Sequence, residues 1–113
     1  MIIPIILQIY TTNNMERTFL RISFEVFGTV QGVYFRACAF DKAIQLGLKG
    51  FVMNTDRDTV VGIAEGYRDK IEEYKYWLGN IGSPASRIEK LEISQEEPIE
   101  SPSYKEFAVR RTY

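Results

Sequence analysis

Apolar and polar residues alternate along residues 20–30. A repeat of two is typical of a strand that buries one face and exposes the other. The apolar face would consist of Leu20, Ile22, Phe24, Val26 and Val30, and the polar face of Arg21, Ser23, Glu25 and Thr29. The pattern predicts a half-buried strand, and the glycines at positions 28 and 32 then mark a turn.

After Arg36 the apolar spacing becomes helical. Ala37, Phe40 and Ile44 would share the packed face of this first helix, and Gly47 would end it. The face turned away from the core would carry Asp41, Lys42 and Gln45.

A second helix is predicted over residues 68–81. The residues at helical spacing are Ile71, Tyr74, Leu78 and Ile81. Gly82 stands at the expected C-terminal cap, and Pro84 prevents the helix from continuing.

The remaining apolar segments are short and predict strands over residues 50–54, 59–65, 88–94 and 104–110. A charged turn at 56–58 separates the first two, and a polar loop over 95–103 separates the last two. The resulting order is βαββαβ plus a terminal strand. This order predicts an α+β, ferredoxin-like sandwich: an antiparallel sheet with two helices on one face.

The composition of the chain argues against several classes of function. The chain has 113 residues and a formal net charge of −1, from 14 basic and 15 acidic residues. A balanced charge argues against tight nucleic-acid binding, which needs a basic face. Cys38 is the single cysteine, so no disulfide can form within the chain, and a reducing compartment is expected. The chain has no histidine, which removes histidine bases and the commonest zinc ligand.

The first 16 residues form an apolar leader that becomes polar from Thr11 onward. Its apolar part is far shorter than the roughly 20 residues of a membrane-spanning helix, and Pro4 interrupts it. We therefore expect a disordered or loosely packed leader over 1–16, a folded domain over 17–113 and no membrane association.

Two segments carry candidate chemistry. In residues 28–36, glycines let the backbone curl, so that N–H groups at a helix start can converge on an anion, and Arg36 can add a bidentate guanidinium. Asn54 ends a predicted strand, where a carboxamide can orient a water molecule. Taken separately, each segment also fits a purely structural role. The first could be a glycine turn with a surface arginine, and the second an asparagine that suits the geometry of a turn.

Together the two segments resemble the acylphosphatase family. The family signature G-x-V-Q-G-V-x-F-R is present in full from Gly28 to Arg36. The second signature, which has glycine, an aromatic residue, a small apolar residue, a variable position and asparagine, is present from Gly50 to Asn54, and Thr55 follows as it commonly does. Further matches are Gly62, Gly66, the segment 82–88 and the ending 107–110, so that the resemblance spans roughly residues 19–111.

The resemblance implies hydrolysis of acyl phosphates to carboxylate and phosphate, with no metal and no cofactor. Arg36 would bind the phosphoryl oxygens, Asn54 would position the attacking water, and Thr55 would steady Asn54. The backbone N–H groups that would complete the phosphate cradle belong to Gln31, Gly32, Val33, Tyr34, Phe35 and Arg36. We expect a cytoplasmic monomer whose partner is a small acyl phosphate rather than nucleic acid or membrane.

The chain also carries partial matches to other functional classes. The turn Asp56-Arg57-Asp58 resembles the motif of Mg²⁺-dependent aspartyl-phosphate phosphatases, but that chemistry needs a parallel α/β sheet. Residues 49–52 resemble the start of an RNA-recognition motif that then fails. Cys38 lacks the arginine of a cysteine-phosphatase loop and is expected to be a buried core thiol. A non-catalytic anion-binding or protein-binding module is the rival of another class, and intact Arg36 and Asn54 argue against it.

Overall fold

The computed structural model describes residues 18–111. The leader predicted over residues 1–16 lies outside this range, as do both ends of the predicted domain 17–113. In chain order the elements are β1 (Phe19–Thr29), α2 (Phe35–Gln45), β2 (Lys49–Asn54), β3 (Val60–Tyr67), α3 (Arg68–Asn80), β4 (Arg87–Ile99) and β5 (Phe107–Arg110). The predicted order of elements is confirmed.

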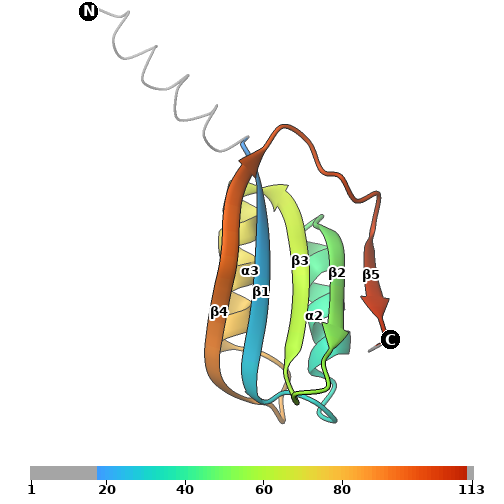
Figure 1. Cartoon of the computed structure of the whole chain (residues 1–113), viewed down its shortest axis with the longest axis vertical. Helices are drawn as coiled ribbons and strands as arrows, with labels where there is room; N and C mark the ends of the chain where they lie inside the picture. Colours follow the sequence, from blue (N-terminus) through green and yellow to red (C-terminus); the bar gives the residue numbers. More distant parts are fainter. Residues whose placement is uncertain (1–17, 112–113) are drawn as a thin grey trace, which may run out of the picture.

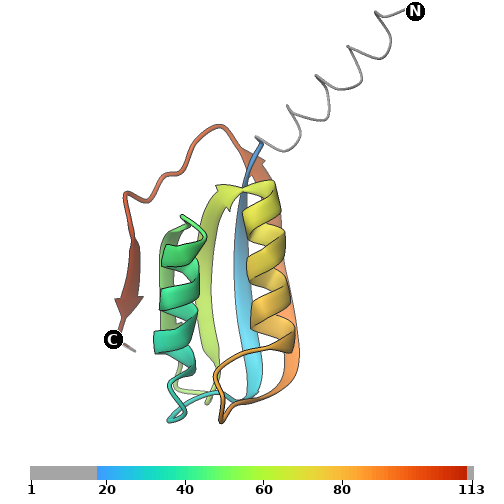
Figure 2. The same ribbon diagram turned by 180° about the vertical axis from the view of Figure 1, so that it is seen from behind.

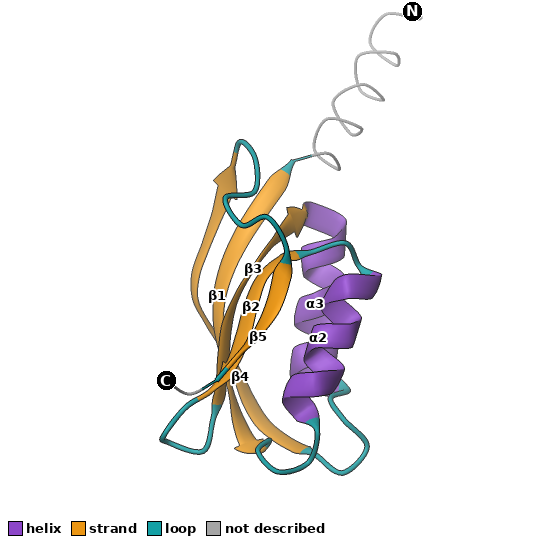
Figure 3. Ribbon diagram, turned by 90° about the vertical axis from the view of Figure 1, so that its right-hand side faces the viewer, coloured by secondary structure: helices purple, strands orange, loops and turns teal. Residues whose placement is uncertain are grey.

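The strands form one sheet in the order β4-β1-β3-β2-β5, and both helices cover the same face (Figures 2 and 3). This arrangement confirms the ferredoxin-like α+β fold. The prediction of a wholly antiparallel sheet needs one correction, because β5 pairs in parallel with β2. After β4 the chain crosses the end of the sheet where β2 starts, so it enters β5 running in the direction of β2 (Figure 1).

The core lies between the sheet and the helices. The apolar face predicted for β1 is confirmed, because Leu20, Ile22, Phe24 and Val26 are all buried. Tyr74 of α3 lies at the centre, where its hydroxyl donates to the carbonyl oxygen of Ala39 at 2.9 Å. Burial raises the pKa of Tyr74, so the phenol stays neutral and keeps this hydrogen bond.

The face predicted for the first helix was wrong at Ala37 and Ile44, whereas Phe40 packs against the core as predicted. Phe35, Ala39 and Ala43 are its buried residues, while Ala37 and Ile44 are exposed. Two of the buried residues are alanines, and small side chains on this face permit a close contact with the sheet that a larger side chain would prevent. On the second helix Ile81 is also exposed, because α3 ends at Asn80 and Gly82 turns the chain with φ +65°.

The polar segment 95–103 was predicted to be a loop, yet β4 continues to Ile99. Because β4 is an edge strand, its backbone pairs with β1 on one side only, and its polar side chains can face solvent. Pro98 is tolerated at this position for the same reason. The terminal strand is shorter than predicted and begins at Phe107.

Candidate active site

A tight loop over residues 30–34 carries the chain from β1 into α2, at the lower end of the molecule in Figure 2. Gly32 and Tyr34 adopt left-handed conformations, with φ +75° and +62°. The first α-helical hydrogen bond runs from the Cys38 N–H to the Tyr34 carbonyl oxygen, at 3.0 Å. Within residues 18–111, no protein acceptor takes a hydrogen bond from the N–H groups of residues 31–37. A helix start of this kind favours an anion.

A hollow of about 360 Å³ opens beside this loop. It is lined by Val30, Gly32, Tyr34, Phe35, Arg36, Ala37 and Asn54. The fold therefore brings together Arg36 and Asn54, which come from the start of α2 and the end of β2. The two signatures of the sequence share one cavity.

Arg36 lies in the first turn of α2 and is half-buried. Its Nη1 donates to the carbonyl oxygen of Arg110 at 3.3 Å. The guanidinium of Arg110 in turn lies over the Phe51 ring, 3.9 Å from its centroid. Strand β5 therefore supplies a backbone contact to the site. The sequence gives no sign of this contact, since a carbonyl group has no sequence signature.

Asn54 is the last residue of β2. Its Oδ1 is buried and has no hydrogen-bond donor within the part of the chain that the structure describes. An unpaired buried carbonyl oxygen costs about 1–3 kcal/mol, which makes it a strong acceptor for a donor that enters the hollow.

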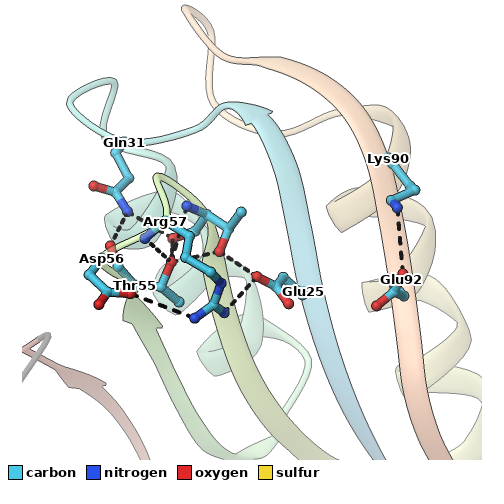
Figure 4. A network of polar contacts seen from close by, with 8 residues as sticks. Glu25, Gln31, Thr55, Asp56, Arg57, Lys90 and Glu92 are labelled. Atoms are coloured by element: carbon cyan, nitrogen blue, oxygen red, sulfur yellow. Dashed lines mark hydrogen bonds and ion pairs between the residues drawn. The ribbon is translucent and has the colours of Figure 1, made fainter.

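The turn after Asn54 is held by side chains from two other elements (Figure 4). The Gln31 Nε2 donates to the carbonyl oxygens of Thr55 and Thr59, at 2.8 and 2.9 Å. The sequence predicts a role for the Gln31 backbone N–H alone, and the structure adds these two side-chain contacts. Thr55 supports the turn, because its hydroxyl accepts hydrogen bonds from the N–H groups of Arg57 and Thr59. That Thr55 steadies Asn54 stays a prediction.

Glu25 of β1 completes this network from the open face of the sheet. Its carboxylate accepts hydrogen bonds from the Thr59 hydroxyl at 2.6 Å and from Arg57 at 2.9 Å. The Thr59 hydrogen bond, opposed by partial burial and reinforced by Arg57, lowers the pKa of Glu25. The sequence offered no signal for Glu25 beyond its place in the strand.

The comparison with protein families agrees with this geometry. The family model described as Acylphosphatase matches residues 22–109, which include both signatures and most of β5. The chain belongs to the acylphosphatase family. Human Acylphosphatase-2 is 43% identical over 89 residues, which cover 79% of this chain and 90% of the human protein.

Solved acylphosphatase structures share the fold. The Coxiella burnetii acylphosphatase superposes with a TM-score of 0.72 at 35% identity, over 84% of this chain and 96% of that one. The Bacillus subtilis acylphosphatase gives 0.73 at 29% identity, over 80% and 98%. The BLUF protein BlrB, at 14% identity and a TM-score of 0.67, shows the fold alone.

Membership of the acylphosphatase family makes this chain a hydrolase. The fold also shows where the residues of the rival motifs lie. Asp56, Arg57 and Asp58 form an exposed turn between two antiparallel strands, β2 and β3, unlike the strand ends of a parallel α/β sheet. No three His, Cys, Asp or Glu side chains of residues 18–111 gather as metal ligands would. Cys38 is half-buried against the core rather than fully enclosed.

Neither helix of the described chain has the length and apolar character needed to cross a membrane.

Proposed function

We propose that this acylphosphatase-family protein hydrolyses acyl phosphates to carboxylate and inorganic phosphate without a metal ion or cofactor. The observation that carries the proposal is the shared hollow. It is lined by Arg36 and Asn54 and bordered by a helix start whose N–H groups have no acceptor within residues 18–111.

The phosphoryl group would lie against the loop of residues 31–36. The N–H groups of Gln31, Gly32, Val33, Tyr34, Phe35 and Arg36 would donate to its oxygens. The guanidinium of Arg36 would complete the cradle with two parallel hydrogen bonds. These donors are fixed before substrate binds, so they stabilise charge in the transition state without reorganisation.

Asn54 would hold the attacking water. Its buried Oδ1 lacks a donor in the described chain and can accept a hydrogen bond from that water. Gln31 and Thr55 support this role, because they fix the turn that begins directly after Asn54. Phosphoryl transfer depends mostly on such positioning and on charge stabilisation.

The chemistry does not demand a histidine. An acyl phosphate releases a carboxylate, a weak base that needs no strong general acid, and the phosphate of the substrate can take the proton of the water. A pH–rate profile that requires an enzyme base would contradict this step.

Three further expectations stay predictions: a folded domain over 17–113, a cytoplasmic location, and a monomer that binds no nucleic acid.

The test is hydrolysis of acetyl phosphate, with and without a chelator, by wild type, Arg36→Ala and Asn54→Ala. We expect each variant to lose about 100-fold or more in kcat/KM, as for removal of a preorganised transition-state contact. Arg87→Ala and Asn80→Ala are matched controls, since both residues are exposed and lie outside the hollow. An inert wild type would contradict the proposal. Activity only with Mg²⁺ would favour the Mg²⁺-dependent motif at the turn 56–58 instead.

A further inference from the structure

Glu25 lies outside the hollow, yet a continuous set of hydrogen bonds joins it to the turn that follows Asn54. Glu25 is on the open face of β1, paired in register with Val61 of β3 and Glu92 of β4. Its side chain is 20% exposed. The Thr59 hydroxyl donates to its Oε2 at 2.6 Å, and Thr59 Oγ1 lies 2.7 Å from Thr55 Oγ1.

The ionised carboxylate fixes the direction of the two hydroxyl hydrogen bonds in this set. A carboxylate can only accept, so the single hydroxyl proton of Thr59 must point to Glu25. In the contact between the two threonines, the donor is therefore Thr55. The Thr55 oxygen accepts from the N–H groups of Arg57 at 3.1 Å and Thr59 at 3.2 Å, which fill its two lone pairs.

The result is one arrangement of the turn rather than several. Without an acceptor at Glu25, the Thr59 proton has no fixed direction, and the Thr55 hydroxyl can donate either to Thr59 Oγ1 at 2.7 Å or to the Thr59 carbonyl oxygen at 3.4 Å. Thr55 directly follows Asn54 in the chain, so freedom in the turn becomes freedom in the direction of the Asn54 carboxamide. A displacement of a reacting group by about 1 Å is enough to slow catalysis strongly.

We infer that Glu25 is a positioning residue: its carboxylate orders the Thr59 and Thr55 hydroxyls and thereby holds Asn54 in the direction that places the water. The inference rests on the proposed function. Glu25 contacts neither the hollow nor Arg36, and it is linked to the phosphate loop through the Gln31 side chain. Its influence should therefore fall more on the water than on the phosphate.

The charges around Glu25 keep it ionised. Arg57 contacts it directly, and Lys90 lies near enough to favour the charged form. The acidic groups on this side are paired with the same cations: Asp56 with Arg57 at 3.6 Å and Glu92 with Lys90 at 3.5 Å (Figure 4). The carboxylate is therefore an acceptor at neutral pH.

The kinetic test compares wild type with Glu25→Ala, Glu25→Gln and Arg57→Ala, using acetyl phosphate as substrate and inorganic phosphate as competitive inhibitor. Glu25→Ala should lower kcat about tenfold and change the phosphate inhibition constant less than about twofold. Glu25→Gln should recover kcat to within about threefold, because an amide oxygen still accepts the Thr59 hydroxyl. Arg57→Ala should stay near wild type, because it removes only the exposed partner of Glu25.

A second readout does not need activity: the NMR signals of the Asn54 side-chain amide in the full chain. These signals should shift in Glu25→Ala and stay in place in Arg57→Ala. If the wild type is inert, the proposed function fails and these signals alone decide the inference. Should Glu25→Ala not fold, Thr59→Val removes the same hydroxyl at nearly constant shape.

Two results would overturn the inference. One is that the wild type is active and Glu25→Ala has the same kcat and the same Asn54 side-chain signals as the wild type. The other is a loss of phosphate affinity that equals the loss of kcat, which would show general distortion of the site.

Discussion

At the scale of single residues, Gln31 links the two halves of the site. Its backbone belongs to the loop that precedes α2, and its side chain donates to two carbonyl oxygens of the turn after β2. One side chain therefore ties the predicted phosphate cradle to the turn that follows Asn54, the residue predicted to position the water. Glutamine suits this position because its amide nitrogen carries two protons, one for each carbonyl oxygen.

Gln31→Leu tests this link. Loss of the two hydrogen bonds at partly buried carbonyl groups should lower the free energy of unfolding by about 1–3 kcal/mol, measured by urea denaturation. Gln95→Leu is the matched control, because Gln95 is exposed on β4 and should change stability by less than about 0.5 kcal/mol. Equal effects of the two substitutions would contradict a role for the Gln31 side chain.

At the scale of elements, α2 shows how packing distance overrides hydrophobicity. The helix buries Ala39 and Ala43 completely, while Ile44 is 53% exposed. Larger side chains at the contact would push α2 away from β2 and β5. Since α2 begins in the loop that borders the hollow, its distance from the sheet also sets the position of Arg36.

Ala43→Leu, which adds hydrophobic volume, should therefore destabilise the protein more than Ile44→Ala, which removes it. Overpacking at Ala43 should lower the free energy of unfolding by about 1–3 kcal/mol. Ile44→Ala should change it by about 0.5 kcal/mol or less, since alanine also has the better helix propensity. Thermal and urea unfolding of both variants provide the measurement. A larger loss of unfolding free energy in Ile44→Ala than in Ala43→Leu would instead support the helix face predicted from the sequence.

At the scale of the whole molecule, Glu65 fastens the chain segment that returns from β4 to β5. Its carboxylate lies on β3 with no exposed surface. It accepts hydrogen bonds from Arg21 of β1 at 2.7 Å, from Ser103 N at 2.8 Å and from Tyr104 N at 3.0 Å. This anchor directs the chain into β5, which brings the Arg110 carbonyl oxygen to Arg36.

Glu65 should also contribute to acid sensitivity. Burial alone would raise the pKa of Glu65, but hydrogen bonds from Tyr104, Ser103 and Arg21 outweigh it and lower the pKa below its ordinary value of 4.5. A lowered pKa in the folded state gives stability that is complete above the unfolded value and is lost as the pH falls through the folded value. The free energy of unfolding should therefore decline below about pH 4.5.

Urea denaturation at several acidic pH values checks this decline. Glu65→Gln should lower stability at neutral pH and flatten the dependence on acid. Glu89→Gln, at an exposed position on β4, should leave the slope near that of wild type. An unchanged slope in Glu65→Gln would show that other carboxylates cause the acid sensitivity.

The sequence by itself determined the order of elements, the buried face of β1 and the pair of signatures that mark the family. These features follow from local periodicity and from residue types at fixed spacing. It also indicated Arg36 and Asn54 as site residues, and the structure places both in one hollow; their catalytic roles stay predictions.

Only the tertiary structure decided which face of α2 is buried, how far β4 extends and where β5 pairs. Each of these depends on a partner distant in the chain: helix packing depends on the space above the sheet, and an edge strand depends on a neighbour's backbone. The same reason applies to the contacts made by Gln31, Glu25 and the Arg110 carbonyl group. Hydrogen bonds between distant segments leave no periodic trace in the sequence, because their geometry exists only after the chain has folded.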